Sequence, residues 1–204
     1  MRLLDMDLSE AIELAEHWLK TSVPSRQEIE IHQAEQHWWP ANSIRHDFCR
    51  QVSFAIPCSQ ALTQIAHHSP RLIEVGAGTG YWTALLAQQD VDIIATDSHT
   101  NGYGLRIGHY FDVQQADAAN AIEQYPDRDV FMCWPSYDEE WTTRAVAAIR
   151  KSGRLLHLIS EGHGGCCGHE DMFNLLDAHF DPIVRVFLPQ WPGIHDDLVI
   201  YRRK

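Results

Sequence analysis

The segment Glu74-Val75-Gly76-Ala77-Gly78-Thr79-Gly80 has the composition of a ligand-binding loop. It follows the apolar run 71–75 and precedes a helical pattern that starts at residue 81, so a strand would lead through a glycine turn into a helix. Glycines let the backbone approach a ligand closely, and the first turn of a helix offers unpaired N–H groups. A dinucleotide site would need two residues before its third glycine, and a phosphate loop would need a Lys-Ser/Thr pair. Neither is present.

Candidate proton acceptors follow several of the expected strands, where open α/β sheets place their sites. His195 is the first choice as a catalytic residue, because a histidine beside acids can titrate near neutral pH. Tyr137 and Glu161 are the other catalytic candidates. The alternatives stay open: His195 as a surface residue in a turn, and Glu161 as a substrate contact or a helix cap.

The segment His163-Gly-Gly-Cys166-Cys167-Gly-His169 contains zinc-ligand residue types, but its spacing matches no common zinc motif. We therefore predict no metal site. A nucleophilic Cys166 or Cys167 would need a paired base, and the sequence offers none. The glycines favour a loop that bends over the ligand pocket.

Short apolar runs alternate with helical patterns along most of the chain. Strands are expected over 71–75, 92–96, 111–115, 130–134, 154–159, 183–188 and 198–202. Helices are expected over 8–20, 26–37, 43–52, 59–67, 81–88, 118–124, 139–151 and 170–180, with Ser9 as the N-cap of the first. Residues 98–110 hold three glycines and predict a loop.

This order predicts a doubly wound, mostly parallel α/β sheet with an antiparallel terminal strand pair. We expect one domain over residues 1–204, in which 1–67 form a helical cap on a ligand-binding core of residues 70–204. His37-Trp38-Trp39 could either roof the site or pack the cap onto the sheet.

The 204 residues carry a formal net charge of −12, which argues against broad nucleic-acid binding. The N-terminus lacks a long apolar run, so neither a signal peptide nor a membrane span is predicted. Five cysteines in irregular spacing do not indicate a disulfide framework. We expect a cytoplasmic protein, and the sequence leaves a homodimer open.

The motif Glu-Val-Gly-Ala-Gly-Thr-Gly-Tyr-Trp resembles motif I of class I S-adenosylmethionine-dependent methyltransferases. The resemblance implies a Rossmann-like, seven-stranded sheet and S-adenosylmethionine as cofactor. Glu74 would then lie near the methionine amino group, and Asp97 would accept hydrogen bonds from both ribose hydroxyls. Asp117 and Ala118 would lie near adenine. The remaining cofactor-binding residues implied are Gly76, Gly78, Thr79, Gly80 and Trp134.

The segment Cys133-Trp134-Pro135-Ser136-Tyr137 occupies the place of the Asn/Asp-Pro-Pro-Tyr motif of amino-group methyltransferases. Trp134 stands where that motif has Asn or Asp, and an indole can only donate a hydrogen bond. Methylation of a nucleobase amino group by that mechanism is therefore disfavoured. Trp134 is either a wall of the cofactor site or a direct substrate contact.

Residues 45–203 also resemble a little-characterised family of small methyltransferase-like proteins. Four segments carry this resemblance: residues 54–57, 133–137, 164–166 and 191–196. The resulting hypothesis is methyl transfer from S-adenosylmethionine to an O, N or S atom of a small molecule. Two alternatives are transfer or cyclisation of the aminocarboxypropyl group, and a non-catalytic S-adenosylmethionine-binding module.

Overall fold

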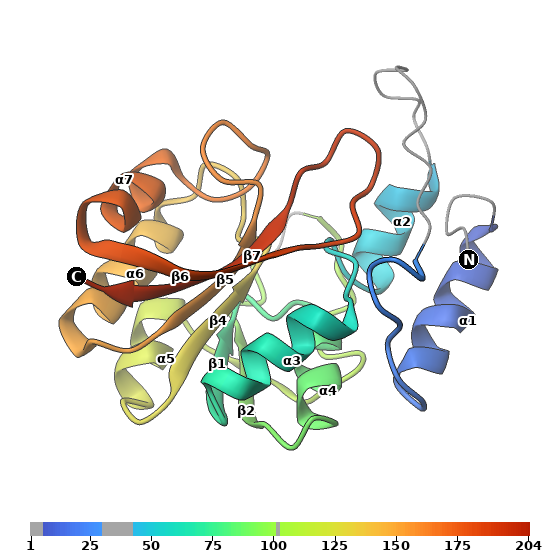
Figure 1. Cartoon of the computed structure of the whole chain (residues 1–204), viewed down its shortest axis with the longest axis horizontal. Coiled ribbons are helices and arrows are strands. Elements are labelled where there is room, and N and C mark those ends of the chain that lie inside the picture. The colour runs from blue at the N-terminus through green and yellow to red at the C-terminus, as the bar shows by residue number, and fades with distance from the viewer. Residues whose placement is uncertain (1–5, 30–42, 101–102) are drawn as a thin grey trace.

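A computed structural model describes residues 6–29, 43–100 and 103–204 of the chain (Figure 1). The helices are α1 (Leu8–Trp18), α2 (Ser43–Gln51), α3 (Ser59–His68), α4 (Tyr81–Ala87), α5 (Ala118–Gln124), α6 (Glu140–Ser152) and α7 (Glu170–His179). The strands are β1 (Arg71–Val75), β2 (Asp92–Asp97), β3 (Val113–Gln115), β4 (Asp129–Cys133), β5 (Leu156–Ser160), β6 (Phe180–Phe187) and β7 (Asp197–Arg203).

The strands form a seven-stranded sheet in the order β3-β2-β1-β4-β5-β7-β6. The first five pair in parallel, and β7 runs antiparallel to both of its neighbours, β5 and β6. β1, β4 and β5 are buried along almost their whole length, as is typical of parallel strands covered on both faces. The predicted Rossmann-like α/β fold with an antiparallel terminal pair is confirmed.

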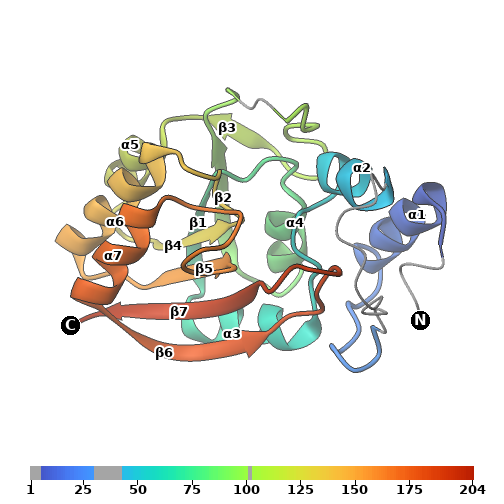
Figure 2. The same ribbon diagram turned by 90° about the horizontal axis from the view of Figure 1, so that it is seen from above.

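Helices cover both faces of the sheet (Figure 2). α5, α6 and α7 pack on one face over a core that includes Ile73, Val130 and Leu158. On the other face, α3 and α4 share a core with α1, and Ala15, Ile65 and Leu86 belong to it. Neighbouring residues of one strand point to opposite faces, so each central strand contributes side chains to both cores.

Two local predictions about the N-terminal helices are wrong. Asp7, not Ser9, is the N-cap of α1, because Asp7 accepts a hydrogen bond from Glu10 N while the Glu10 carboxylate accepts one from Asp7 N. The helix expected over 26–37 does not begin at residue 26, since residues 26–28 form a turn. The rest of that helix, and the segment His37-Trp38-Trp39, lie outside the described residues.

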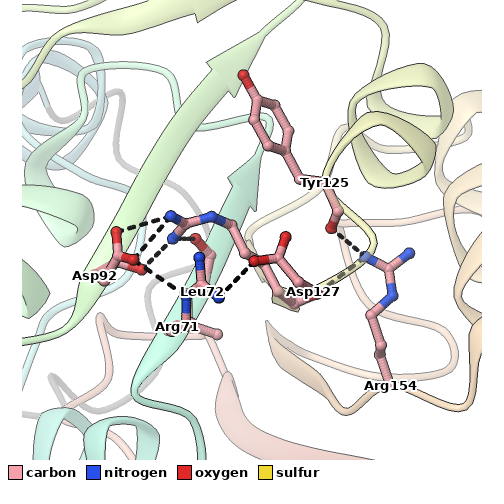
Figure 3. A network of polar contacts seen from close by, with 7 residues as sticks. Arg71, Leu72, Asp92, Tyr125, Asp127 and Arg154 are labelled. Atoms are coloured by element: carbon pink, nitrogen blue, oxygen red, sulfur yellow. Dashed lines mark hydrogen bonds and ion pairs between the residues drawn. The ribbon is translucent and has the colours of Figure 1, made fainter.

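A network of arginines and carboxylates joins the amino ends of β1, β2 and β4 (Figure 3). The guanidinium of Arg71 lies 2.6 Å from Asp127 Oδ2 and 3.2 Å from Asp92 Oδ2. Arg128, which is buried, donates to both carboxylate oxygens of Asp92 and to the carbonyl oxygen of Leu72. This network therefore closes the edge of the sheet opposite the glycine loop.

Replacing Arg128 with methionine is expected to lower the free energy of unfolding by about 2 kcal/mol, because buried acceptors lose a charged donor. Urea denaturation would measure this loss. Arg71→Met is the matched control, because the Arg71 side chain is 51% exposed and its ion pairs are screened by water. It should cost under about 1 kcal/mol. Equal losses in the two variants would contradict the difference in burial.

No helix in the described parts of the chain combines the length and hydropathy needed to cross a membrane.

Candidate active site at the glycine loop

The glycine loop connects β1 to α4 through three residues with positive φ: Gly76 at 70°, Gly78 at 52° and Gly80 at 76°. A Cβ atom on Gly80 would lie 2.9 Å from Phe111 Cβ, which is too close for any side chain. A Cβ atom on Gly76 would lie 3.1 Å from the ring of Trp141. Glycine is therefore required at these positions both by the backbone conformation and by the neighbouring side chains.

Asp97, the last residue of β2, is hydrogen-bonded to the glycine loop. Its Oδ2 accepts a hydrogen bond from Gly78 N at 2.9 Å, and its Oδ1 accepts one from His99 N at 2.8 Å. Each carboxylate oxygen can accept a further bond. The two backbone bonds hold Asp97 in one orientation and leave it able to bind a ligand with hydroxyl groups.

Glu74 is a buried carboxyl group in β1, one residue before the strand ends. The Thr83 hydroxyl of α4 donates a hydrogen bond to Glu74 Oε2. Burial raises the pKa of Glu74 to about 8. The Thr83 bond opposes this rise and the charge of Asp97 adds to it. Glu74 is therefore suited to receive a cationic group of a ligand.

Asp117 and Ala118 lie where β3 leads into α5. Asp117 is the N-cap of α5, and its Oδ1 accepts hydrogen bonds from Ala119 N and Asn120 N. Its Oδ2 lies 3.4 Å from Arg144 Nη2 of α6. Asp117 thus has a structural role that the sequence analysis missed, in addition to its place in the site.

These residues line a cavity of about 320 Å³ at the carboxyl ends of β1, β2, β3 and β4. The volume lies near the lower end of the range for small-molecule sites, and the position is where open α/β sheets bind ligands. Eight of the nine residues predicted to bind the cofactor line this cavity: Glu74, Gly76, Gly78, Thr79, Asp97, Asp117, Ala118 and Trp134. Gly80 is not among the lining residues, since it packs against Phe111.

The hydroxyl of Thr79 is engaged within the protein. It donates to the carbonyl oxygen of Val52 and accepts from Tyr81 N at 3.3 Å. Thr79 therefore ties the glycine loop to the segment that follows α2, and its contribution to the cavity wall does not include a free hydroxyl group.

The three predicted catalytic residues are not brought together. Tyr137 lines the cavity, whereas Glu161 and His195 are not among its lining residues. Glu161 accepts hydrogen bonds from the backbone N–H groups of His195 and Cys166, so it joins the loop after β5 to the loop before β7. The side chain of His195 is exposed. The prediction of His195 as the base facing the ligand therefore has no support in its placement.

Trp134 has φ of +52°, a conformation that is rare for a large aromatic residue. Its indole stacks on the ring of Phe54 with centroids 5.5 Å apart, and the guanidinium of Arg45 lies over the indole at 5.4 Å. Its Nε1 donates to Asp196 Oδ2 at 2.8 Å. These contacts fix the indole of Trp134 in place at the cavity lining, which favours its role as a wall.

Asp196 anchors this wall through the hydrogen bond that it accepts from Trp134. It is fully buried, and its Oδ1 has no hydrogen-bond partner among the described residues. Burial raises the pKa of Asp196 to about 6, although the Trp134 hydrogen bond opposes the shift. Its position depends on a contact 62 residues away along the chain.

The cysteines and histidines of the loop after β5 mainly form contacts that stabilise the structure. His163 lies 3.0 Å from both Glu170 and Asp177, and His169 caps α7. Cys166 lines the cavity as a free thiol, and burial raises its pKa. Within the described ranges, no group of three His, Cys, Asp or Glu side chains is arranged to hold a metal ion.

Several lining residues were not singled out from the sequence. Arg144 and Trp141 come from α6, Cys49 from α2, and Tyr103 and Leu105 from the segment after β2. The spacing of residues within a motif could not have revealed them, because each comes from a segment outside the glycine loop. The segments 54–57 and 133–137 were local signals for this side of the cavity.

No protein-family model matches the chain, and no curated protein matches it. Among solved structures, a TehB-like SAM-dependent methyltransferase from Corynebacterium glutamicum is similar with a TM-score of 0.49 and 14% identity over 71% of this chain and 86% of the other. The N-methyltransferase NodS from Bradyrhizobium japonicum gives 0.47 and 16%, over 72% and 93%. A 1,6-didemethyltoxoflavin-N1-methyltransferase from Burkholderia thailandensis gives 0.46 and 15%, over 72% and 77%. This distant similarity leaves the function to be argued from the cavity itself.

Proposed function

We propose that this chain is an S-adenosylmethionine-dependent methyltransferase that acts on an O, N or S atom of a small molecule. The proposal rests on the hydrogen bond that Asp97 Oδ2 accepts from Gly78 N of the glycine loop. This bond lies at the same cavity as the buried Glu74. A carboxylate with remaining acceptor capacity suits a ribose diol, and a buried carboxyl group suits an ammonium group. Asp117 and Ala118 supply another part of the cavity lining.

The charge of the cavity fits this cofactor. Among the residues that the structure describes, four carboxyl side chains line it, Glu74, Asp97, Asp117 and Glu139, against one arginine, Arg144. S-adenosylmethionine carries a sulfonium and an ammonium group against one carboxylate, so an acidic lining favours it. When bound, it would supply an activated methyl group.

The protein's own residues would then bind, align and enclose the reactants. The glycine loop and Asp97 would hold the cofactor, and the Trp134 wall would exclude water. Tyr137 is the predicted catalytic residue that lines the cavity, so its hydroxyl is proposed to orient the acceptor or carry its proton.

Product analysis tests the reaction class. The protein would be incubated with labelled S-adenosylmethionine and a metabolite extract, and we expect S-adenosylhomocysteine together with a labelled methylated product. Methylthioadenosine as the main product would instead support transfer or cyclisation of the aminocarboxypropyl group. Binding without either product would support a non-catalytic module.

Binding of S-adenosylmethionine is expected to release a proton near neutral pH. The free protein keeps Glu74 mostly protonated below its pKa of about 8, and an ammonium group beside Glu74 would favour the charged carboxylate. Affinity should therefore fall as the pH is lowered from 8 to 6, by up to about tenfold per pH unit. Calorimetry in two buffers with different ionisation enthalpies would count the released protons.

Glu74→Gln is the control for this linkage, because glutamine keeps the size and one acceptor of Glu74 but cannot titrate. Its affinity for S-adenosylmethionine should be lower and nearly independent of pH over the same interval. A wild-type protein that releases no proton at pH 7 would contradict the role assigned to Glu74.

A further inference from the structure

Four of the aromatic side chains that line the cavity, Phe54, Tyr103, Trp134 and Tyr137, are here called the aromatic mouth. Phe54 stacks on Trp134 and meets Tyr103 edge to face, with ring centroids 6.2 Å apart. Tyr103 is 45% and Tyr137 is 59% exposed. These are two of the three exposed large hydrophobic side chains among the described residues, so exposed aromatic surface is concentrated at this cavity.

The aromatic mouth is built on a fixed support. Trp134 is held in its unusual backbone conformation by the Phe54 stack, by Arg45 and by the buried Asp196. A backbone conformation of this kind persists only where the surroundings enforce it, and such positions cluster at functional sites. The rings of Trp134 and Phe54 therefore form a preformed surface for a ligand.

The charges around the cavity disfavour an anion. The carboxyl groups of Glu74, Asp97, Asp117 and Glu139 all line it. Arg144 is the lining cation among the described residues, and it is engaged by Asp117. An anionic ligand would lose its hydration beside these carboxyl groups, and Arg144, the cation that lines the cavity, is already paired with Asp117.

We propose that the molecule modified at this site is a planar aromatic compound without a negative charge, and that it lies against the aromatic mouth. Tyr103, Tyr137 and the face of Phe54 turned away from Trp134 would supply the ring contacts. Aromatic pairs of this kind contribute specific affinity beyond the burial of apolar area. This inference rests on the proposed function, in which the glycine-loop side of the cavity holds the cofactor.

The test uses the full chain saturated with S-adenosylhomocysteine and equilibrium dialysis of three probes of similar size. 2-Naphthol is aromatic and neutral, naphthalene-2-carboxylate is aromatic and anionic, and trans-2-decalol is neutral and saturated. 2-Naphthol should bind at least about tenfold more tightly than the carboxylate. It should bind roughly 2- to 12-fold more tightly than the decalol.

Variants of the mouth locate the binding. Tyr103→Leu and Tyr137→Leu should each weaken 2-naphthol binding by roughly 2- to 12-fold and leave the affinity for S-adenosylhomocysteine unchanged. Tyr137→Phe keeps the ring and should retain 2-naphthol binding. Phe187→Leu replaces an exposed aromatic residue outside the cavity lining and should have no effect.

Equal binding of 2-naphthol and the decalol, or binding of the carboxylate at least as tight as that of 2-naphthol, would overturn the inference. The same holds if the tyrosine-to-leucine variants behave like Phe187→Leu. If S-adenosylhomocysteine still binds in those cases, the proposed function survives. A protein that does not bind S-adenosylhomocysteine would overturn the proposed function, and this inference with it.

Discussion

Replacing Asp97 with alanine is expected to weaken the binding of S-adenosylmethionine by at least about 100-fold. Hydrogen bonds to a charged group contribute roughly 1.5–3 kcal/mol each, and in the proposed site Asp97 accepts two of them from the ribose hydroxyls. The substitution also removes the acceptor that holds Gly78 N and His99 N. The loop would then lose its fixed shape as well as its ligand contact.

Isothermal titration calorimetry would measure this loss, with circular dichroism to verify the fold of the variant. Asp181→Ala is a suitable control, because Asp181 is an exposed residue of the edge strand β6. Asp97→Asn should fall between the wild type and Asp97→Ala, since the amide keeps one acceptor oxygen. Binding by Asp97→Ala at wild-type affinity would exclude Asp97 from the site.

The second large effect concerns His157, a fully buried residue of β5. Its Nε2 lies 2.7 Å from Ser69 Oγ, and Ser69 Oγ donates to Asp129 Oδ2 at 2.6 Å. Ser69 must therefore accept from His157, which places the imidazole proton on Nε2. Nδ1 is buried without a partner among the described residues. Burial, with a smaller effect of His68, lowers the pKa of His157 to about 3.

This shift makes the protein sensitive to acid. The folded-state pKa of His157 is below the unfolded value of about 6.5, so its neutral form contributes stability that is fully present above pH 6.5. That stability is lost as the pH falls from about 6.5 toward 3. Glu74 has a raised pKa and acts in the opposite direction, favouring the folded state as the pH falls from 8 to 4.5. The two effects offset each other between pH 6.5 and 4.5.

A comparison with His157→Gln isolates the histidine, because glutamine cannot take up the proton. Between pH 7 and pH 4, the wild type should lose about 3 kcal/mol more of its free energy of unfolding than this variant. Urea denaturation at each pH would measure the difference. His17→Gln, at an exposed position of α1, should follow the wild type. Parallel pH profiles for wild type and His157→Gln would show that His157 does not control acid stability.

The sheet could be predicted because its signals are local. Short apolar runs such as 71–75 and 92–96 alternate with helical patterns, and parallel strands of this kind bury both faces. The strand order brings the ends of β1 and β2 together, so the proximity of the glycine loop and Asp97 follows from the fold. Cap residues were harder, since Ser9 and Asp7 are both good N-cap residues and differ by two positions.

The other side of the cavity could not be predicted because it depends on contacts between distant segments. Thr79 donates a hydrogen bond to the Val52 carbonyl, and Trp134 donates one to Asp196. Glu161 accepts a hydrogen bond from the backbone N–H of His195. Residue type alone made His195 and Glu161 attractive as catalytic groups. Only the three-dimensional arrangement shows that Glu161 is engaged by backbone N–H groups while His195 faces solvent.

The central claim is that the glycine loop, Glu74 and Asp97 form one S-adenosylmethionine site. Calorimetric titration of the intact chain with S-adenosylhomocysteine, which lacks the reactive methyl group and stays unchanged during the measurement, tests this claim most directly. We expect saturable binding of one molecule per chain that competes with S-adenosylmethionine and is strongly weakened in Asp97→Ala. Absence of binding by the intact, folded chain, or equal binding by Asp97→Ala, would contradict the claim.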